Sequence, residues 1–406
     1  MIQTMATLIQ TKNSPGRGQS RFALWDLGFR PFYLLASTFA SLSILVWAMQ
    51  FSGLLPYAYL RGPMWHAHEM LFGFTLAVLT GFLLTAGQNW SGQATPKGAY
   101  LAALAALWVA GRILVLSPWT WLAAAVNVAF PLAIATALAI ALYRGRNRRN
   151  YFFVALLLLM AVAQLVVHLN ALGVLRVPGW AGIALGLDVM LLVLSVMGGH
   201  VIPMFTNNSI PGAKAVRQPW VEKLALALVL LLIAADATHV SGTWFALLAV
   251  LAMLAHVARL WLWQPWKTLH TPLVWVLHAA YAWIPLHLVF RAMAAMGWVS
   301  SSVANHALTV GAIGTMVIGM MTRTALGHTG RKLIATKAEV SCYALVSAAA
   351  VIRVFVPLVN PLLVTYAVLL SAAMWSLGFA IYTVRYWRIL SRAPTSYSSV
   401  TVMPAG

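Results

Sequence analysis

Eleven histidines stand out in this 406-residue chain because most of them fall within long apolar stretches. A lone imidazole in hydrocarbon is costly unless it has a partner or a function. Taken singly, each histidine is explained well enough as a packing residue that hydrogen-bonds a neighbouring helix. Taken together they indicate metal binding, because imidazole is a common axial ligand of b-type haem and a good ligand for copper.

The densest arrangement of such residues is Trp65-His66-Ala67-His68-Glu69-Met70. Residues two apart on a helix point about 200° away from each other, so His66 and His68 cannot both bind one metal from a regular helix face. Either His66 lies in an irregular turn after Pro63, or the two histidines have separate partners. Glu69 is a candidate catalytic residue that delivers protons, and its alternative role is to orient a neighbouring histidine.

The composition of the chain identifies the medium around these residues. Apolar residues make up 62% of the chain and charged residues 8%, whereas soluble globular proteins have about 25% charged residues. Because about 20 apolar residues cross a bilayer, the chain is predicted to be an all-α, polytopic membrane protein. We expect about twelve transmembrane helices, over residues 32–54, 66–87, 98–116, 120–143, 151–172, 180–203, 220–238, 243–263, 273–296, 303–325, 338–357 and 361–384.

The net charge of +20 arises from basic residues in the gaps between these apolar runs. Basic residues accumulate in cytoplasmic loops, so we assign them to topology and expect no nucleic-acid partner. With both termini cytoplasmic, the outer side holds only five of the 26 basic residues, namely Arg61, Arg112, Arg176, Arg291 and Arg353. The prediction is a multi-pass protein of a bacterial inner membrane, surrounded by membrane lipids. Its parts are a cytoplasmic N-terminal segment over 1–31, a membrane domain over 32–384 and a cytoplasmic tail over 385–406.

Depth in the membrane divides the histidines into two groups. The outer group comprises His66, His68, His168, His239 and His306, with His287 somewhat deeper, and the inner group comprises His200, His256, His270, His278 and His328. The single cysteine, Cys342, excludes thiolate clusters and covalent haem attachment through paired cysteines. His200 and His278 are candidates for binding a second haem, with helix packing as the alternative. Arg323 and Arg331, in a cytoplasmic turn, either bind haem propionates or follow the charge rule.

An internal repeat relates the second and tenth predicted spans. Aligning His68 with His306 places Gly73 opposite Gly311, Gly81 opposite Gly319 and Gly92 opposite Gly330 without a gap. The implied repeats cover 32–143, 151–263 and 273–384 and would form a pseudo-threefold bundle, although glycine matches also arise wherever membrane helices pack closely. In that bundle His68 and His306 would face each other as the two ligands of one haem. The arrangement resembles the central subunit of haem-copper oxidases and nitric oxide reductases, which takes haem ligands from its second and tenth helices.

Longer motifs extend across most of the chain. They are Phe29-Arg30-Pro31-Phe32-Tyr33, the histidine segment at 65–70, Gly81-Phe82-Leu83-Leu84-Thr85, Val201-Ile202-Pro203-Met204-Phe205-Thr206, and the stretch 306–314 that runs on to 321–323 and 327–331. These motifs resemble the NnrS family, membrane proteins associated with haem, copper and the bacterial response to nitric oxide. The resemblance implies a protein with haem b, and with copper as a second cofactor. It would bind nitric oxide, or reduce it to nitrous oxide, in nitrosative-stress defence.

We therefore expect a site near the outer surface, with His68 and His306 as the leading haem ligands. His66, His168 or His287 are the candidates for copper, and Glu69 would relay protons. The chain has no c-type haem motif, so electrons for a reductase would come from quinol or a partner protein. Two other classes of protein are alternatives: a twelve-helix secondary transporter, and a haem-binding regulatory membrane protein without turnover.

Overall fold

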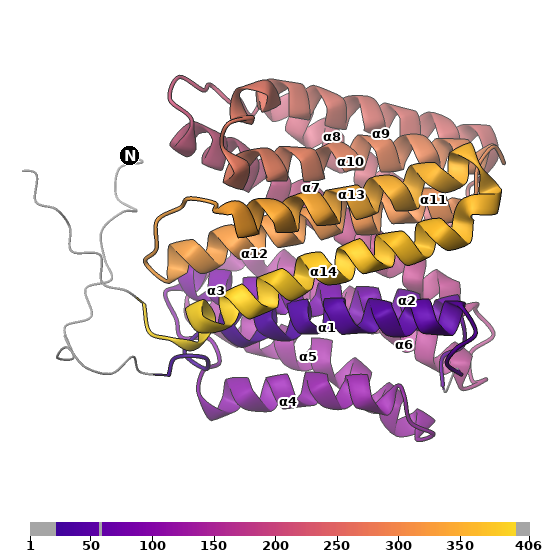
Figure 1. Cartoon of the computed structure of the whole chain (residues 1–406), viewed down its shortest axis with the longest axis horizontal. Coiled ribbons are helices and arrows are strands. Elements are labelled where there is room, and N and C mark those ends of the chain that lie inside the picture. The colour runs from indigo at the N-terminus through magenta and orange to yellow at the C-terminus, as the bar shows by residue number, and fades with distance from the viewer. Residues whose placement is uncertain (1–21, 57–58, 395–406) are drawn as a thin grey trace, which may run out of the picture.

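The computed structural model describes residues 22–56 and 59–394, and within them the chain is helical apart from one isolated bridge between Phe22 and Arg392 (Figure 1). The elements are α1 (Phe29–Phe51), α2 (Pro63–His68), η1 (Glu69–Thr75), α3 (Leu76–Ser91), α4 (Ala99–Leu114), α5 (Thr120–Arg144), η2 (Arg148–Asn150), α6 (Tyr151–Ala171), α7 (Gly179–Ser209), α8 (Pro219–Ala237), α9 (Gly242–Leu262), η3 (Pro265–Thr268), α10 (Pro272–Ala295), α11 (Ser301–His306), η4 (Ala307–Gly314), α12 (Thr315–His328), α13 (Lys337–Val359), η5 (Pro361–Leu363) and α14 (Val364–Ser391). We call the end of the bundle with the Phe22–Arg392 bridge the terminal end, and the other the distal end.

Within the described residues, 10 helical segments are long and apolar enough to cross a membrane. Two more complete the bundle: α4, which is apolar but has 16 residues, and α8, which carries charged residues near both ends. The predicted all-α, multi-pass architecture is confirmed. The predicted ends of the membrane domain, at residues 32 and 384, differ slightly from the structure. α1 already begins at Phe29, and α14 continues to Ser391. The rest of the predicted terminal segments, 1–21 and 395–406, lies outside the described residues.

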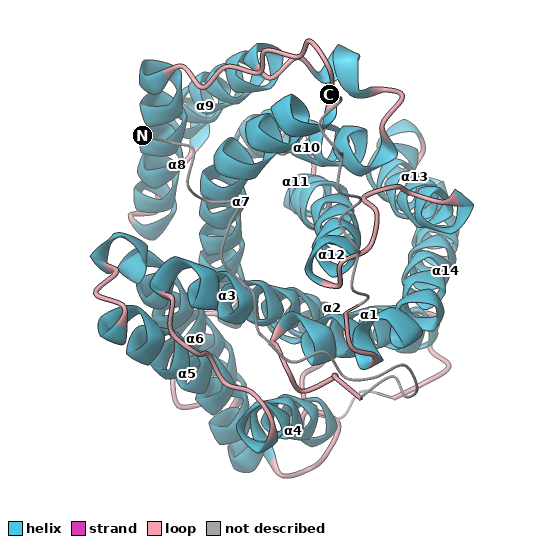
Figure 2. Ribbon diagram, turned by 90° about the vertical axis from the view of Figure 1, so that its left-hand side faces the viewer, coloured by secondary structure: helices cyan, strands magenta, loops and turns pink. Residues whose placement is uncertain are grey.

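The twelve segments pack in a cyclic order. Grouped as α1–α5, α6–α9 and α10–α14, the last helix of each group packs against the first helix of the next: α5 on α6, α9 on α10, and α14 on α1. Figure 2, which views the helices nearly end-on, shows α13 and α14 closing the ring beside α1. Three four-helix groups around a common axis would give this order. That the groups are repeats in sequence stays a prediction.

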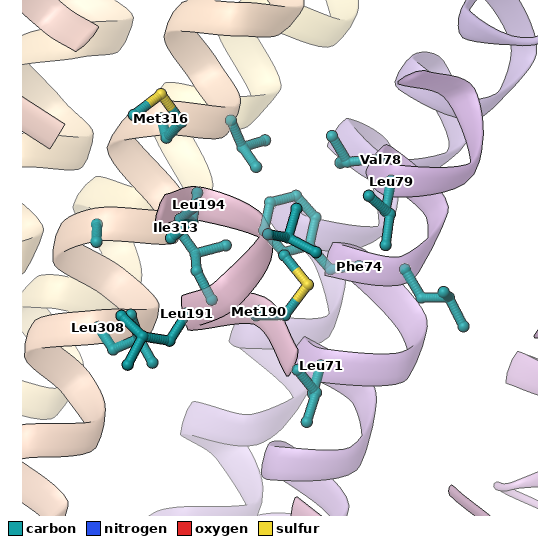
Figure 3. Close-up of a cluster of buried hydrophobic side chains, with 14 of the residues drawn as sticks. Leu71, Phe74, Val78, Leu79, Met190, Leu191, Leu194, Leu308, Ile313 and Met316 are labelled. Atoms are coloured by element: carbon teal, nitrogen blue, oxygen red, sulfur yellow. The ribbon is translucent and has the colours of Figure 1, made fainter. Parts of the chain in front are cut away.

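The second segment of each group faces the centre of the bundle. There η1 and α3 lie beside α7 and the η4–α12 segment, and buried apolar side chains pack between them, among them Leu71, Phe74, Met190, Leu191 and Ile313 (Figure 3). Lipid is as apolar as these side chains, so their association depends on close packing rather than on hydrophobic burial.

Two π-helical segments interrupt the predicted second and tenth spans. η1 directly follows His68 and η4 directly follows His306, so the two histidines hold the same position relative to an irregularity. π-helical turns are rare and occur frequently at functional sites. Each contains a glycine at a close approach: a Cβ on Gly73 would lie 2.7 Å from Phe39 and 2.8 Å from Arg112, and one on Gly311 would collide with Trp283. Both glycines were paired by the predicted repeat.

A buried ion-pair network holds the second group together. Arg259 of α9 is 1% exposed, and its guanidinium donates to both carboxylate oxygens of Glu222, at 3.1 and 2.8 Å. It also donates to the hydroxyl of Tyr281 (2.6 Å) and to the carbonyl of Ser195 (3.0 Å). The Tyr281 hydroxyl in turn bonds Nδ1 of His256 at 2.6 Å. His256 is thus a packing histidine with a partner.

Gly199 of α7 is the position that makes room for this arginine, because a Cβ there would overlap the Arg259 guanidinium. We expect Gly199→Ala to displace the guanidinium from Glu222 and to destabilise the protein by about 3 kcal/mol or more, as for a broken buried ion pair. Thermal unfolding in detergent measures this. The control is Gly327→Ala, whose new methyl would find its nearest neighbour at 3.8 Å; equal melting temperatures for the two variants would contradict the assignment.

Candidate functional site

The first histidine pair joins α2 to α6. His68 and His168 are both fully buried, and their Nε2 atoms lie 3.2 Å apart. Two imidazole nitrogens at this separation either share a proton or bind one metal ion. Metal–nitrogen bonds of about 2.0–2.1 Å with a roughly tetrahedral angle would place the two nitrogens about 3.2–3.4 Å apart. The pair therefore has the spacing of two ligands of one tetrahedral metal.

A carboxylate fixes the orientation of the His68 ring. Nδ1 of His68 lies 2.7 Å from Oε1 of Glu69, and Nη1 of Arg112 donates to the same oxygen at 2.6 Å. A histidine that donates through Nδ1 to a carboxylate presents the lone pair of Nε2 to a metal. The second guanidinium nitrogen of Arg112 bonds Oδ1 of Asn127 in α5, so this network ties η1 to α4 and α5.

Two further polar side chains complete the surroundings of the pair. Nε2 of Gln164 lies 3.3 Å from Nε2 of His68 and 3.2 Å from Oδ1 of Asn127. The hydroxyl of Tyr59, in the loop before α2, lies 3.3 Å from Nδ1 of His168. Burial raises the pKa of Tyr59 to about 12, so this hydroxyl keeps its proton near neutral pH and can donate to His168 or accept from it.

The second histidine pair lines a cavity of about 570 Å³ at the distal end. His66 of α2 and His306 of α11 have nearly parallel rings (10°) with centres 6.3 Å apart, and His66 also stacks on Trp47 at 4.8 Å. Nδ1 of His306 donates to the carbonyl of Ser302 at 2.7 Å, so the lone pair of this ring is on Nε2. Arg353 of α13 also lines this cavity. The remaining lining is mostly apolar, from α1, α7 and α14.

Arg353 differs from the other arginines that lie deep in the bundle. Arg112 is paired with Glu69, and Arg291 is paired with Asp188 and Asp236. For Arg353 the described part of the chain offers neither a hydrogen bond nor an acidic partner. A positive charge in a poorly hydrated cavity is expensive unless it is paired.

A family model described as NnrS protein matches residues 23–393, nearly the whole chain. The chain belongs to the NnrS family. No curated protein matches it. The matched region of this NnrS protein begins and ends where the chain ends meet, since the amide of Ala23 donates to the carbonyl of Ser391 at 2.8 Å. The family match thus covers the closed ring of helices and both histidine pairs.

One geometric expectation for the NnrS chain is wrong. His68 and His306 do not form one facing pair, because His68 lies against His168 and His66 lies against His306. The reason is the helical rotation between residues two apart, which points His66 and His68 to different sides of α2. Of the two alternatives for these histidines, separate partners is the one that the structure confirms.

The other predicted residues lie apart from both pairs. His287 is buried and bonds the carbonyl of Ala304 at 2.8 Å through Nδ1, which ties α10 to the segment that carries His306. His278 bonds the hydroxyl of Thr206 (2.8 Å), whereas His200 is exposed and bonds the Val196 carbonyl of its own helix (2.8 Å). These two inner histidines have separate environments, which fits the packing alternative.

Arg323 and Arg331 lie at the terminal end. Arg323 donates to Ser209 at 3.3 Å and covers the ring of Phe205 at 3.9 Å, while Nη1 of Arg331 is buried with no hydrogen-bond partner in the described region. Along the α11–α12 segment, Arg323 is about 25 Å from His306 at 1.5 Å per residue. Neither arginine can therefore contact a group held in the distal cavity.

Sequence reasoning missed five side chains that complete the two pairs: Tyr59, Arg112, Asn127, Gln164 and Arg353. Arg112 and Arg353 were assigned to topology as outer-side charges. A usable signal was present, because an ionisable residue inside an apolar span marks a functional site by default. Asn127 and Gln164 gave a similar signal, because they are amide side chains within apolar runs, but a weaker one than an ionisable residue gives.

The Glu69–Arg112 pair predicts a specific pattern of stabilities. Glu69→Gln would leave the buried Arg112 charge uncompensated and should lower the free energy of unfolding by about 3–5 kcal/mol. The double variant Glu69→Gln with Arg112→Gln removes both charges and should recover most of that loss. Thermal or denaturant unfolding in detergent, read as a double-mutant cycle, measures the coupling; a double variant no more stable than Glu69→Gln would show that the pair is not coupled.

Proposed function

We propose that this NnrS protein is a haem b protein of the bacterial inner membrane that binds nitric oxide in nitrosative-stress defence. Its termini would lie in the cytoplasm, and the distal cavity would be the haem site. The observation that carries the proposal is the unpaired Arg353 in a cavity that two histidines also line. That combination offers a cation for an anionic group, together with metal ligands, in one largely apolar cavity.

Arg353 fits the carboxylate part of a haem. Its charge has no acidic partner in the described structure, and guanidinium groups bind carboxylates through short, paired hydrogen bonds. A haem propionate would supply the missing negative charge. The same cation would also serve any other carboxylate, so the argument needs the two histidines as well.

His66 and His306 fit the iron. Both imidazoles line the cavity, with nearly parallel rings whose centres lie 6.3 Å apart, and imidazole is the common protein ligand of b-type haem, so the two histidines would hold the iron. The bond from Nδ1 of His306 to the Ser302 carbonyl is the usual support for a coordinating histidine. A cavity of about 570 Å³ is within the range of cofactor sites.

His68 and His168 are our candidates for copper, the second cofactor. Imidazole suits copper, and Glu69 holds the His68 ring with its Nε2 toward His168. We therefore propose Glu69 as a positioning residue. Because His66 and His68 point to different sides of α2, the two metals would occupy separate spaces.

Haem, when bound, supplies the iron chemistry that binds nitric oxide, which would take the place of one of the two histidines. The chain itself would hold the group through His66, His306 and Arg353, and its apolar lining would limit water around it. A second metal beside the iron would help two nitric oxide molecules to couple, and the copper candidates do not line the haem cavity, so we propose binding rather than reduction. A reductase would in addition need quinol or a partner protein as electron donor.

The haem proposal predicts the visible spectrum of the purified protein. Wild type should show a Soret band that shifts when nitric oxide is added to the reduced protein. His306→Ala should lose most of the bound haem, and His66→Ala should shift the band. Arg353→Leu should weaken haem binding by about tenfold or more, since a charge-assisted hydrogen bond contributes about 1.5–3 kcal/mol.

His200→Ala is the matched control, because that exposed histidine bonds only its own helix and its loss should leave the spectrum unchanged. A colourless, well-folded wild type would end the haem proposal. Unchanged spectra in both His66→Ala and His306→Ala would place the haem elsewhere.

The copper proposal predicts that the protein can lose copper and still keep its haem. His168→Ala should lose bound copper and keep the Soret band, because the first pair, His68 and His168, does not line the haem cavity. Elemental analysis of purified protein, alongside the spectrum, measures both metals. His239→Ala is the control, as His239 is exposed past the end of α8. Copper retained by His168→Ala, or haem lost together with copper, would contradict two separate sites.

A further inference from the structure

A second concave surface lies on the outer wall of the bundle, where α5 meets α6 at the terminal end. It is a groove of about 800 Å³, lined by Ala139, Ile140, Tyr143 and Arg144 from α5 and by Tyr151 and Ala155 from α6, among others. Its walls are apolar apart from Arg144 and the tyrosine hydroxyls. Tyr143 is 76% exposed and Ile140 is 45% exposed, so the groove faces the surroundings of the protein.

Four arginines gather at the end of this groove. Arg144, Arg146, Arg148 and Arg149 lie in or beside the short loop from α5 to α6, and all four are exposed. No acidic partner is found for any of them in the described ranges. Five of the six acids in the chain are paired with other cations: Glu69, Asp188, Glu222, Asp236 and Glu339. The loop therefore carries a concentrated, uncompensated positive charge.

This loop has a fixed conformation. Nδ2 of Asn147 donates to the carbonyl of Trp90 at 2.7 Å, and Oδ1 of Asn147 accepts from the amide of Asn150 at 3.3 Å. Gly145 packs so closely on Ser91 that a Cβ would overlap its backbone, and Arg146 has φ of 51°, in the left-handed region. Charges that only set topology need no fixed geometry. Here the arginines are held at the mouth of an apolar groove.

We propose that this groove binds one anionic phospholipid. An acyl chain would lie along the apolar seam between α5 and α6, and the phosphate would meet the arginines, with Tyr143 and Tyr151 at the level of the headgroups. The wall lies between two membrane-length helices, where the neighbouring molecules are lipids. The concentration of positive charge selects an anionic headgroup over a zwitterionic one.

The position of the groove gives the lipid a structural effect. α5 carries Asn127 and α6 carries Gln164 and His168, so the seam under the lipid also aligns the network around the first histidine pair. A lipid that clamps α5 onto α6 would stabilise this part of the bundle. The inference does not depend on haem or copper being bound.

The test measures lipid binding to the purified full chain by native mass spectrometry and by thermal unfolding in detergent. Phosphatidylglycerol should bind and raise the melting temperature, whereas phosphatidylcholine should not. Arg144→Gln with Arg148→Gln and Arg149→Gln should weaken phosphatidylglycerol binding about 100-fold, from three charges that each contribute about fivefold. Ala155→Phe keeps every charge, fills the groove from an exposed position, and should weaken binding as well.

The control removes three charges from terminal-end positions that do not line this groove: Lys214→Gln, Lys223→Gln and Lys337→Gln, all exposed. Retained phosphatidylglycerol binding there supports the proposal, and an equal loss would reduce the effect to general charge. Glycerol phosphate, a headgroup without acyl chains, should not stabilise the protein. Stabilisation by glycerol phosphate, or unchanged binding in Ala155→Phe, would overturn a lipid site in this groove.

Discussion

Carboxylates are scarce in this protein, and the pairing of five of the six with arginines constrains the rest of the structure. Glu69 joins η1 to Arg112 on α4, Glu222 joins α8 to Arg259 on α9, and Asp188 and Asp236 join α7 and α8 to Arg291 on α10. Hydrophobic burial does not hold helices together within lipid, so these ion pairs fix how the segments meet. Once the acids are engaged in this way, Arg353 is left in its cavity without one. The anion site that we propose at Arg353 thus depends on the same ion pairs that stabilise the bundle.

The short helix α2 contributes one histidine to each of the two pairs. α2 turns His66 toward His306 on one side and His68 toward His168 on the other, and the π-helical turn η1 follows at once. The two pairs have different environments: His68 is held by a carboxylate, an amide and a second imidazole, whereas His66 is held by an aromatic ring beside a cavity. The effect of a substitution in α2 must therefore be measured at both histidine pairs.

The segments of the fold could be predicted from the sequence because a bilayer demands long apolar runs and sorts basic residues between its sides. The contacts could not, since they depend on helix rotation. His68 and His168 are a hundred residues apart, and nothing in a single sequence fixes which faces of α2 and α6 meet. No sequence rule predicts the π-helical segments either, although each contains one of the two glycines, Gly73 and Gly311, that the predicted repeat aligns. The place of Arg353 in the cavity could not be predicted for a different reason: an unpaired arginine and a topological one look identical in a sequence until the acids have been assigned to their partners.

α14 packs against α1, so the first and last of the described helices are neighbours in the ring. Phe22 and Arg392 lie side by side, and the seam between α14 and α1 is packed like the seams at α5–α6 and α9–α10. Joining Phe22 to Arg392 and opening a different loop would therefore leave the packing of the helices and both histidine pairs unaltered. The packing of the helices is therefore cyclic, and a chain that began at a different helix could form the same arrangement.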